Sequence, residues 1–277
     1  MPQRRFCQVD VFTAEPYRGN PVAVVLDGDG LDAAQMQAIA SWTNLSETTF
    51  VFRPGNPEAD YRLRIFTPTG ELPFAGHPTI GSAHAMLASG FKPRRAGELV
   101  QECGVGLVRM RTGEEGIRIA LPSAQFRPAG EVIRHAVEQA IGAPLLENPV
   151  AVDLGIVWLT AQVAGGELLR GLRPDMNRVA EAAKKAGTNG INIFGLDGES
   201  VEVRSFAPHE GTPEDPVCGS GNGAVAYYLR ERRGPVDYQA RQGRCVGRDG
   251  RIAIAHENDT IWLGGLAVNC IEGYILA

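Results

Sequence analysis

Short runs of alternating or β-branched apolar residues recur along the chain, and turn-forming sequences separate them. Such runs predict strands, because a period of two places alternate side chains on one face of a sheet. They lie at 8–12, 22–26, 61–66, 117–121, 157–163, 201–206 and 252–255. Turn signals include RGNP near 18 and RPGNP near 53. The sequence GRDGR near 247, between two apolar runs, predicts a tight hairpin turn.

Three segments carry apolar residues at the spacing of an amphipathic helix. They are LDAAQMQAIASW, EVIRHAVEQAIG and RPDMNRVAEAAKKAG. Asp32 and Gln35 form a capping-box pattern at the start of the first segment, and Gly187 is placed to end the third. Two further helices are expected to begin inside glycine-rich turns, at PTIGSAHAML and GNGAVAYYLRERR.

The order of these elements repeats once. The pattern R-x-F-x-P occurs at 64–68 and again at 204–208, and a capped helix followed by a strand precedes both copies. The glycine turns that follow are aligned at Gly76 and Gly219, with a three-residue insertion before the second turn. A single long period predicts two similar domains, because a solenoid would need many short units. The boundary is expected near 123–130.

Composition narrows the classes of protein. The 277 residues are 44% hydrophobic, which is enough to bury a core. Lys+Arg number 27 and Asp+Glu 32, and the net charge of −5 gives no electrostatic reason to bind nucleic acid or an anionic membrane. No run approaches the ~20 apolar residues of a membrane span, and no signal peptide is expected. Five scattered cysteines without C-x-x-C predict no disulfide framework and favour a reducing cytoplasm.

Each half contains an extended segment that ends in a small-residue turn and opens a helix, at FAGHPTIGSAHAM and VCGSGNGAVAYYL. A helix N-terminus presents unpaired N–H groups and partial positive charge, and glycine lets a ligand approach the backbone. One such turn is most simply a tight turn before a structural helix. Two in duplicated halves, if both meet at one interface, predict a site for a small anion such as a carboxylate.

Other glycine-rich motifs do not fit. No P-loop spacing is present, and the glycine spacing supports neither a dinucleotide fingerprint nor a nucleophile elbow, which makes an NAD enzyme a distant alternative. The five histidines show no metal-binding spacing. We therefore expect neither a cofactor nor a metal.

Glu47 is the candidate general base. It lies in NLSETTFVF, between a helix and an apolar strand, and its apolar neighbours predict partial burial. Burial raises the pKa of a carboxyl group and makes it a useful base near neutral pH. The repeat places Gly190 opposite Glu47, so the other half supplies no matching acid. The alternative is a solvent-exposed glutamate at a helix end.

The remaining candidates lie at the two helix starts. His77 is placed to donate to a substrate or to shuttle a proton, or else to bond a nearby carbonyl. Asp215 would act near the second start or simply form the turn before proline. Ser220 would cap the helix or contact the ligand. Cys218 would be a thiolate favoured by the helix dipole or a small buried residue.

These segments together resemble the PhzF-like isomerase family of phenazine biosynthesis, within the diaminopimelate-epimerase-like fold. The matching pieces keep their order over most of the chain: VDVFT, GNPVAVV, LSETTFV, RIFTPTGELPFAGHPTIG, EDPVCGSGN and QGRCVGRDG. The resemblance implies an α+β protein of two similar duplicated domains, each a mostly antiparallel barrel-like sheet around a central helix, with the active site between them. The halves are expected at 1–125 and 126–263, and a last strand at 264–277 is able to cross back to the first half.

The resemblance also implies site residues. Glu47 takes the position of the general acid/base. The positions of the family's GH pair, DP aspartate and GS pair are Gly76, His77, Asp215, Gly219 and Ser220. His77, Asp215 and Ser220 would orient the substrate or share in the proton movement. Cys218 departs from the commoner threonine, and the resemblance assigns no role to its thiol.

Epimerases of the wider superfamily use two opposed cysteines, one in each half. Cys218 occupies one of these places, but Ala75 occupies the other, which disfavours a two-thiol racemase. We expect a cofactor-independent isomerase of a small carboxylate-bearing metabolite, with Glu47 as its single acid/base. Two alternatives stay open: an epimerase or racemase that uses Cys218 with Glu47, and a non-catalytic protein that binds a metabolite or a protein partner. The resemblance is also compatible with a homodimer.

Overall fold

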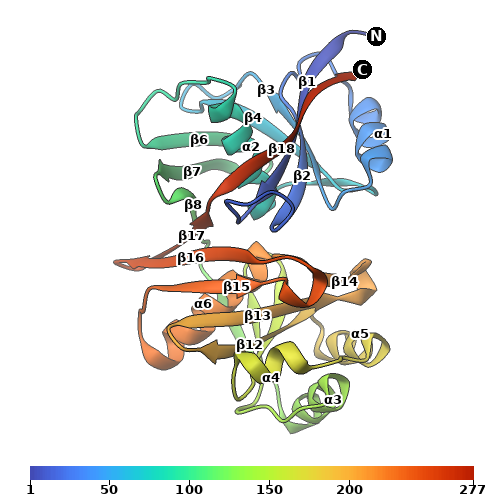
Figure 1. Cartoon of the computed structure of the whole chain (residues 1–277), viewed down its shortest axis with the longest axis vertical. Coiled ribbons are helices and arrows are strands. Elements are labelled where there is room, and N and C mark those ends of the chain that lie inside the picture. Colours follow the sequence, from blue (N-terminus) through green and yellow to red (C-terminus); the bar gives the residue numbers. More distant parts are fainter. The chain divides into compact units, whose positions relative to one another are not determined.

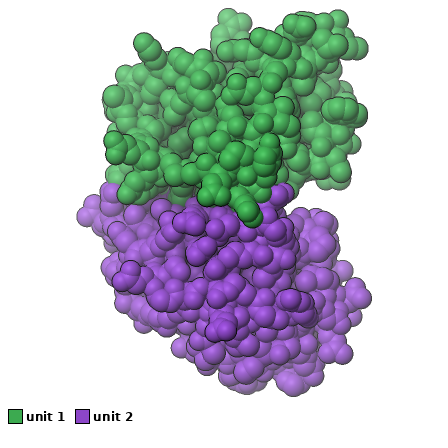
Figure 2. Space-filling view, in the orientation of Figure 1, with its two compact units in different colours: residues 1–120, 264–277 green, residues 121–263 purple.

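The computed structural model describes all 277 residues, which form two compact units (Figure 2). Unit 1 comprises residues 1–120 together with 264–277, and unit 2 comprises residues 121–263. Each unit is a mostly antiparallel sheet with one helix buried against it (Figure 1). The predicted α+β class with two similar domains is therefore confirmed.

Unit 1 contains eight strands from the first part of the chain and one from its end. They are β1 (Gln3–Val11), β2 (Asn20–Val25), β3 (Thr48–Phe52), β4 (Tyr61–Phe66), β5 (Glu71–Leu72), β6 (Glu98–Cys103), β7 (Gly106–Gly113), β8 (Gly116–Ala120) and β18 (Ala267–Leu276). The strand pairs are antiparallel except for β2–β3 and β4–β6. The C-terminal strand β18 pairs with β1 along its whole length, which places the chain's two ends in the same sheet.

Two helices complete unit 1. Helix α1 (Ala33–Thr43) begins with the predicted capping box, in which Asp32 accepts from the Gln35 amide, and buries Met36 and Ala40 against the sheet. Helix α2 (Gly76–Ala88) packs against β1, β2, β3, β8 and β18. Most of its residues are buried, and small side chains from Gly81 to Ala83 let the strands approach it closely.

Unit 2 repeats this plan. Its strands are β9 (Gln125–Pro128), β10 (Val150–Asp153), β11 (Val157–Gln162), β12 (Gly190–Asp197), β13 (Ser200–Ala207), β14 (Thr212–Asp215), β15 (Tyr238–Gln242), β16 (Gly250–Glu257) and most of β17 (Thr260–Gly265). Helices α3 (Glu131–Ile141), α4 (Gly166–Gly171) and α5 (Met176–Ala186) accompany them, and α3 and α5 pack on one hydrophobic cluster. Helix α6 (Gly219–Arg233) is the buried counterpart of α2 and packs against β10, β11, β12 and β16.

The pairing registers of the two units are equivalent. The strand pairs β2–β3 and β11–β12 are both parallel, and each is followed by an antiparallel pair that carries the R-x-F pattern. Phe50 lies opposite Arg64 in unit 1, and Ile193 lies opposite Arg204 in unit 2. The internal sequence repeat therefore corresponds to a structural duplication.

One local prediction was wrong. GRDGR does not form a tight hairpin, because Gln242 of β15 pairs with Gly250 of β16, and the connection between them holds a 3₁₀ turn at Arg244–Val246. The turn residues belong to a longer loop whose Arg244 side chain contacts Glu202, a buried carboxylate of β13. This tertiary contact favours the longer connection. None of the helices is both long and apolar enough to span a membrane.

Candidate active site

Glu47 lies at the entry to β3, just after α1. The chain leaves α1 through Asn44, whose left-handed φ of 55° turns the backbone, and the Glu47 carbonyl accepts a hydrogen bond from the Ala23 amide. The Glu47 side chain is only 15% exposed, and its buried Oε2 has no hydrogen-bond partner. Burial without compensation penalises the carboxylate, which raises the pKa of Glu47 to about 7.

His77 is the second residue of α2, and the structure brings it to Glu47. Its Nε2 lies 3.3 Å from Glu47 Oε2, and the His77 side chain is 10% exposed. At this distance the two side chains form an ion pair when the imidazole is protonated. The carboxyl group and the imidazole thus form a buried pair at the start of the central helix, suited to moving a proton.

The start of α2 leaves room beside this pair. Its N-cap, Ala75, has no side chain able to accept a hydrogen bond from the helix, so the first amides depend on other partners. A Cβ added at Gly76 would meet only Ile119 Cδ1, at 3.5 Å. Neither backbone strain nor internal packing therefore requires glycine at position 76, and its small size leaves the turn approachable.

In unit 2, Cys218 caps helix α6. Its Sγ accepts a hydrogen bond from the Gly221 amide at 3.2 Å, and the side chain is buried. Burial raises the pKa of the Cys218 thiol far above its usual value, so the group is a neutral thiol. The capping role that the sequence offered to Ser220 belongs to Cys218.

Ser220 has a different partner. Its Oγ accepts a hydrogen bond from the Trp158 indole Nε1 at 3.0 Å. The backbone amides of Gly219 and Ser220 make no hydrogen bond within the protein and form the open start of α6. Asp215 accepts from the Val217 amide at 2.9 Å, the geometry of a turn-forming aspartate.

Gln242 holds this turn through two hydrogen bonds, and its role was not predicted from the sequence. Its Oε1 accepts from the Cys218 amide at 3.1 Å, and its Nε2 donates to the Asp215 carbonyl at 2.9 Å. The matching segment QGRCVGRDG contained Gln242, but nothing in its local pattern indicated the contact. Trp158 was missed for the same reason, since it lies inside an ordinary apolar strand.

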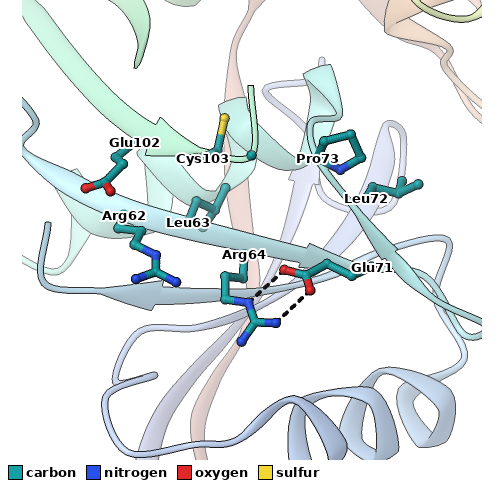
Figure 3. A pocket seen from close by; sticks show the side chains of 9 residues that line it. Arg62, Leu63, Arg64, Glu71, Leu72, Pro73, Glu102 and Cys103 are labelled. Atoms are coloured by element: carbon teal, nitrogen blue, oxygen red, sulfur yellow. Dashed lines mark hydrogen bonds and ion pairs between the residues drawn. The ribbon is translucent and has the colours of Figure 1, made fainter. Parts of the chain in front are cut away.

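An arginine–glutamate pair braces the segment before each central helix. Arg64 donates twice to Glu71, at 2.7 and 2.6 Å (Figure 3), and Arg204 donates twice to Glu214, at 2.9 and 2.8 Å. Each guanidinium also lies over the phenylalanine of its R-x-F pattern. Each pair joins the strand that carries the arginine to the short strand that leads toward the helix.

The hollow in Figure 3 lies beside the first of these pairs and has a volume of about 500 Å³. Its lining is Arg62, Leu63, Arg64, Glu71, Leu72, Pro73, Glu102, Cys103 and Gly104. Neither Glu47 nor His77 belongs to it. The hollow is thus separate from the carboxyl–imidazole pair. No group of three or more His, Cys, Asp or Glu side chains is arranged to hold a metal ion.

Comparisons with known proteins agree with this architecture. The model of the PhzC-PhzF family, described as phenazine biosynthesis-like protein, matches residues 9–273. The chain is 39% identical to antisense-enhancing sequence 1 of Schizosaccharomyces pombe, over 99% of both chains. It is 34% identical to trans-2,3-dihydro-3-hydroxyanthranilate isomerase of Pseudomonas aeruginosa, over 90% of this chain and 88% of the relative.

Among solved structures, a Bacillus anthracis phenazine biosynthesis protein of the PhzF family matches with a TM-score of 0.87. The two sequences are 25% identical, and the match covers 100% of both chains. The family resemblance seen in the motifs is thereby confirmed. The chain belongs to the PhzC-PhzF family of phenazine biosynthesis-like proteins.

Proposed function

We propose that this protein, an enzyme of the isomerase class, moves a proton within a small carboxylate-bearing metabolite, with Glu47 as its single acid/base and without a cofactor. The observation that carries the proposal is the buried Glu47 carboxyl beside His77, with its pKa raised to about 7. Relatives named as isomerases, including the P. aeruginosa enzyme, support the reaction class.

Glu47 is suited to both halves of a proton transfer. A group whose pKa lies near the working pH is present in both protonation states, so it can accept a proton from carbon and later return it. A single base that removes a proton from one carbon and returns it to another carbon on the same face of the substrate catalyses an isomerisation. His77, at 3.3 Å, is placed to stabilise the carboxylate or to donate to the substrate.

The helix starts are proposed to bind the anionic part of the substrate. The free amides of Gly219 and Ser220 add the partial positive charge of α6, and the open turn at Gly76 offers the equivalent feature of α2. Asp215 is proposed to keep the second turn in shape and to contact the substrate. A carboxylate suits such a donor set, because it accepts hydrogen bonds and carries the complementary charge.

The geometry weakens the epimerase alternative. A thiol base must ionise, but the Cys218 thiol is buried, accepts the Gly221 amide as a helix cap, and has a strongly raised pKa. Its counterpart at the start of α2 is Ala75, which has no ionisable group. A one-base mechanism at Glu47 needs neither residue to react.

The test is proton exchange in heavy water, followed by NMR. Trans-2,3-dihydro-3-hydroxyanthranilate, the substrate in the P. aeruginosa relative's name, is the first compound, and a panel of small cyclic and linear carboxylates follows. The wild-type protein should isomerise at least one compound and introduce deuterium at the new C–H position. The variant Glu47→Gln should remain folded, and its isomerisation rate should fall by about 10²-fold or more.

Glu181→Gln is the matched control, because Glu181 is exposed on α5. It should keep the full rate. A folded Glu47→Gln protein with near wild-type turnover would refute the assignment of the base. Binding of a panel compound without turnover would instead favour the non-catalytic alternative.

A further inference from the structure

The pairing registers show what unit 2 carries at the position of Glu47. In both units, one strand residue lies opposite the phenylalanine of R-x-F: Thr48 in β3 and Ile191 in β12. The residues just before them, Glu47 and Gly190, are therefore equivalent. Unit 2 has no side chain where unit 1 has its carboxyl group.

An indole ring occupies the space over Gly190. Trp158 lies beside Gly190 in the parallel pair β11–β12 and is 3% exposed. A Cβ at Gly190 would lie 2.4 Å from Trp158 Cζ3 and 2.5 Å from the Phe206 carbonyl oxygen, so no larger residue fits. Gly190 therefore leaves the space that the Trp158 ring fills. Unit 2 has an indole N–H donor in the region where unit 1 has the Glu47 carboxyl group.

The helix starts are equivalent in the same way. Ser220 is the second residue of α6, as His77 is of α2. In unit 1 the second residue meets a carboxyl group at 3.3 Å, and in unit 2 it meets the Trp158 indole N–H at 3.0 Å. The Glu47–His77 pair therefore has a counterpart of different chemistry, Trp158–Ser220.

The indole fixes the direction of the Ser220 hydroxyl. An indole N–H only donates, so the Ser220 oxygen must accept from it. The other neighbour is Cys218 Sγ, at 3.5 Å, where either group can donate; the sulfur is a weak acceptor and already accepts from the Gly221 amide. Because Ser220 is only partly buried, its own O–H proton remains available to an outside acceptor.

We propose that Trp158 is a positioning residue, which holds Ser220 as a hydrogen-bond donor toward the carboxylate of the substrate. The inference rests on the proposed function, because that function makes Ser220 a substrate contact. With the amides of Gly219 and Ser220, the Ser220 hydroxyl gives this start of α6 three hydrogen-bond donors for the oxygens of a carboxylate.

The hydrogen bond is tested first, without a ligand. The chain has three tryptophans, so three indole N–H signals are expected in a ¹H–¹⁵N spectrum of the whole protein. Trp158→Phe and Trp42→Phe assign two of them, and Trp42 is 86% exposed. Ser220→Ala should shift the Trp158 signal toward that of an unbonded indole, and Ser220→Thr should restore it. An unmoved signal in Ser220→Ala would overturn the proposal.

The second test measures the dissociation constant of anthranilate, a cyclic carboxylate, by calorimetry. Trp158→Phe keeps an aromatic ring but removes the donor, and it should weaken binding about threefold to tenfold. Trp42→Phe is the matched control and should change nothing. Ser220→Ala should weaken binding by a similar factor, and adding Trp158→Phe to it should have no further effect, because the two residues act through one hydroxyl.

With the isomerised substrate, Trp158→Phe should raise KM by the same factor and leave kcat within about twofold, as expected for a binding contact. If Trp158→Phe weakened anthranilate binding by the same factor in the wild type and in Ser220→Ala, Trp158 would have a merely structural role, and the proposal would be overturned. Unchanged anthranilate binding in Ser220→Ala would also overturn it. The loss of turnover in Glu47→Gln would stand in either case, which separates this inference from the proposed function.

Discussion

At the scale of single residues, Glu47 combines chemical usefulness with a cost to folding. Its Oε2 is buried with no hydrogen bond, so the ionised form is unfavourable and the pKa rises to about 7. A glutamate with only a structural role at a helix end would be exposed to solvent, and burial would not raise its pKa. The neighbouring His77 is the only ion-pair partner that the structure records for this carboxyl group, and it carries a charge only when its imidazole is protonated.

The raised pKa predicts a pH-dependent stability. The folded protein holds the Glu47 proton up to about pH 7, whereas the unfolded chain releases it near 4.5, so the stabilisation present below 4.5 is lost as pH rises to 7. The shift corresponds to about 3 kcal/mol at most. Glu47→Gln carries no charge and should avoid this loss, so above pH 7 it should be more stable than the wild type.

Urea unfolding at several pH values between 5 and 8 measures this difference. Glu181→Gln should follow the wild-type curve, because its carboxyl group is exposed. Parallel curves for Glu47→Gln and the wild type would mean that the carboxyl group is not buried in solution.

Cys218 is a second residue whose role depends on its contacts. As an N-cap that accepts from the Gly221 amide, it should be replaceable by serine, which is a preferred cap. Cys218→Ser should therefore keep the turnover, whereas Cys218→Ala should lose about 1 kcal/mol of unfolding free energy. Rate assays and thermal melts check both. A folded Cys218→Ser protein without activity would restore the epimerase alternative.

At the scale of elements, an equivalent arginine–glutamate pair precedes each of the two central helices, but the two pairs differ in burial. The Arg204–Glu214 pair is nearly buried, with side chains 5% and 10% exposed, and Arg204 also donates to the carbonyls of Leu169 and Leu172. The Arg64–Glu71 pair is 22% and 41% exposed. The same bidentate contact is therefore partly exposed to water before one helix and nearly buried before the other.

This difference predicts unequal costs of the same substitution. Arg204→Met leaves a buried carboxylate without a partner and should lower the unfolding free energy by about 3–5 kcal/mol. Arg64→Met leaves Glu71 solvated and should cost about 1 kcal/mol or less. Denaturant unfolding of both variants, followed by a signal from each unit, measures the ratio. Similar losses would contradict the burial of the Arg204 pair.

At the scale of the whole molecule, the chain is a duplication whose copies have diverged in chemistry. The registers, the arginine–glutamate pairs and the buried helices are common to both units. Unit 1 keeps an acid and an imidazole, whereas unit 2 has an indole, a hydroxyl and a capping thiol at the matching places. Unit 2 therefore has no candidate acid/base at the place that Glu47 occupies in unit 1.

Local patterns were enough to predict much of this protein. The capping box at Asp32, the helix end at Gly187 and the repeated R-x-F-x-P pattern depend on residues a few positions apart, and the structure has all three. The same patterns did not predict β7, because its exposed residues do not alternate cleanly, and β18 was expected only from the family resemblance.

Burial and long-range contacts needed the folded chain. Apolar neighbours in the sequence predicted partial burial of Glu47, but the size of its pKa shift depends on which distant segments exclude water from its carboxyl group. Trp158 and Ser220 are 62 residues apart, and they meet because β11 and α6 pack together. Short-range preferences are encoded by adjacent side chains, whereas solvation and pairing across a sheet arise only when distant segments exclude water from each other.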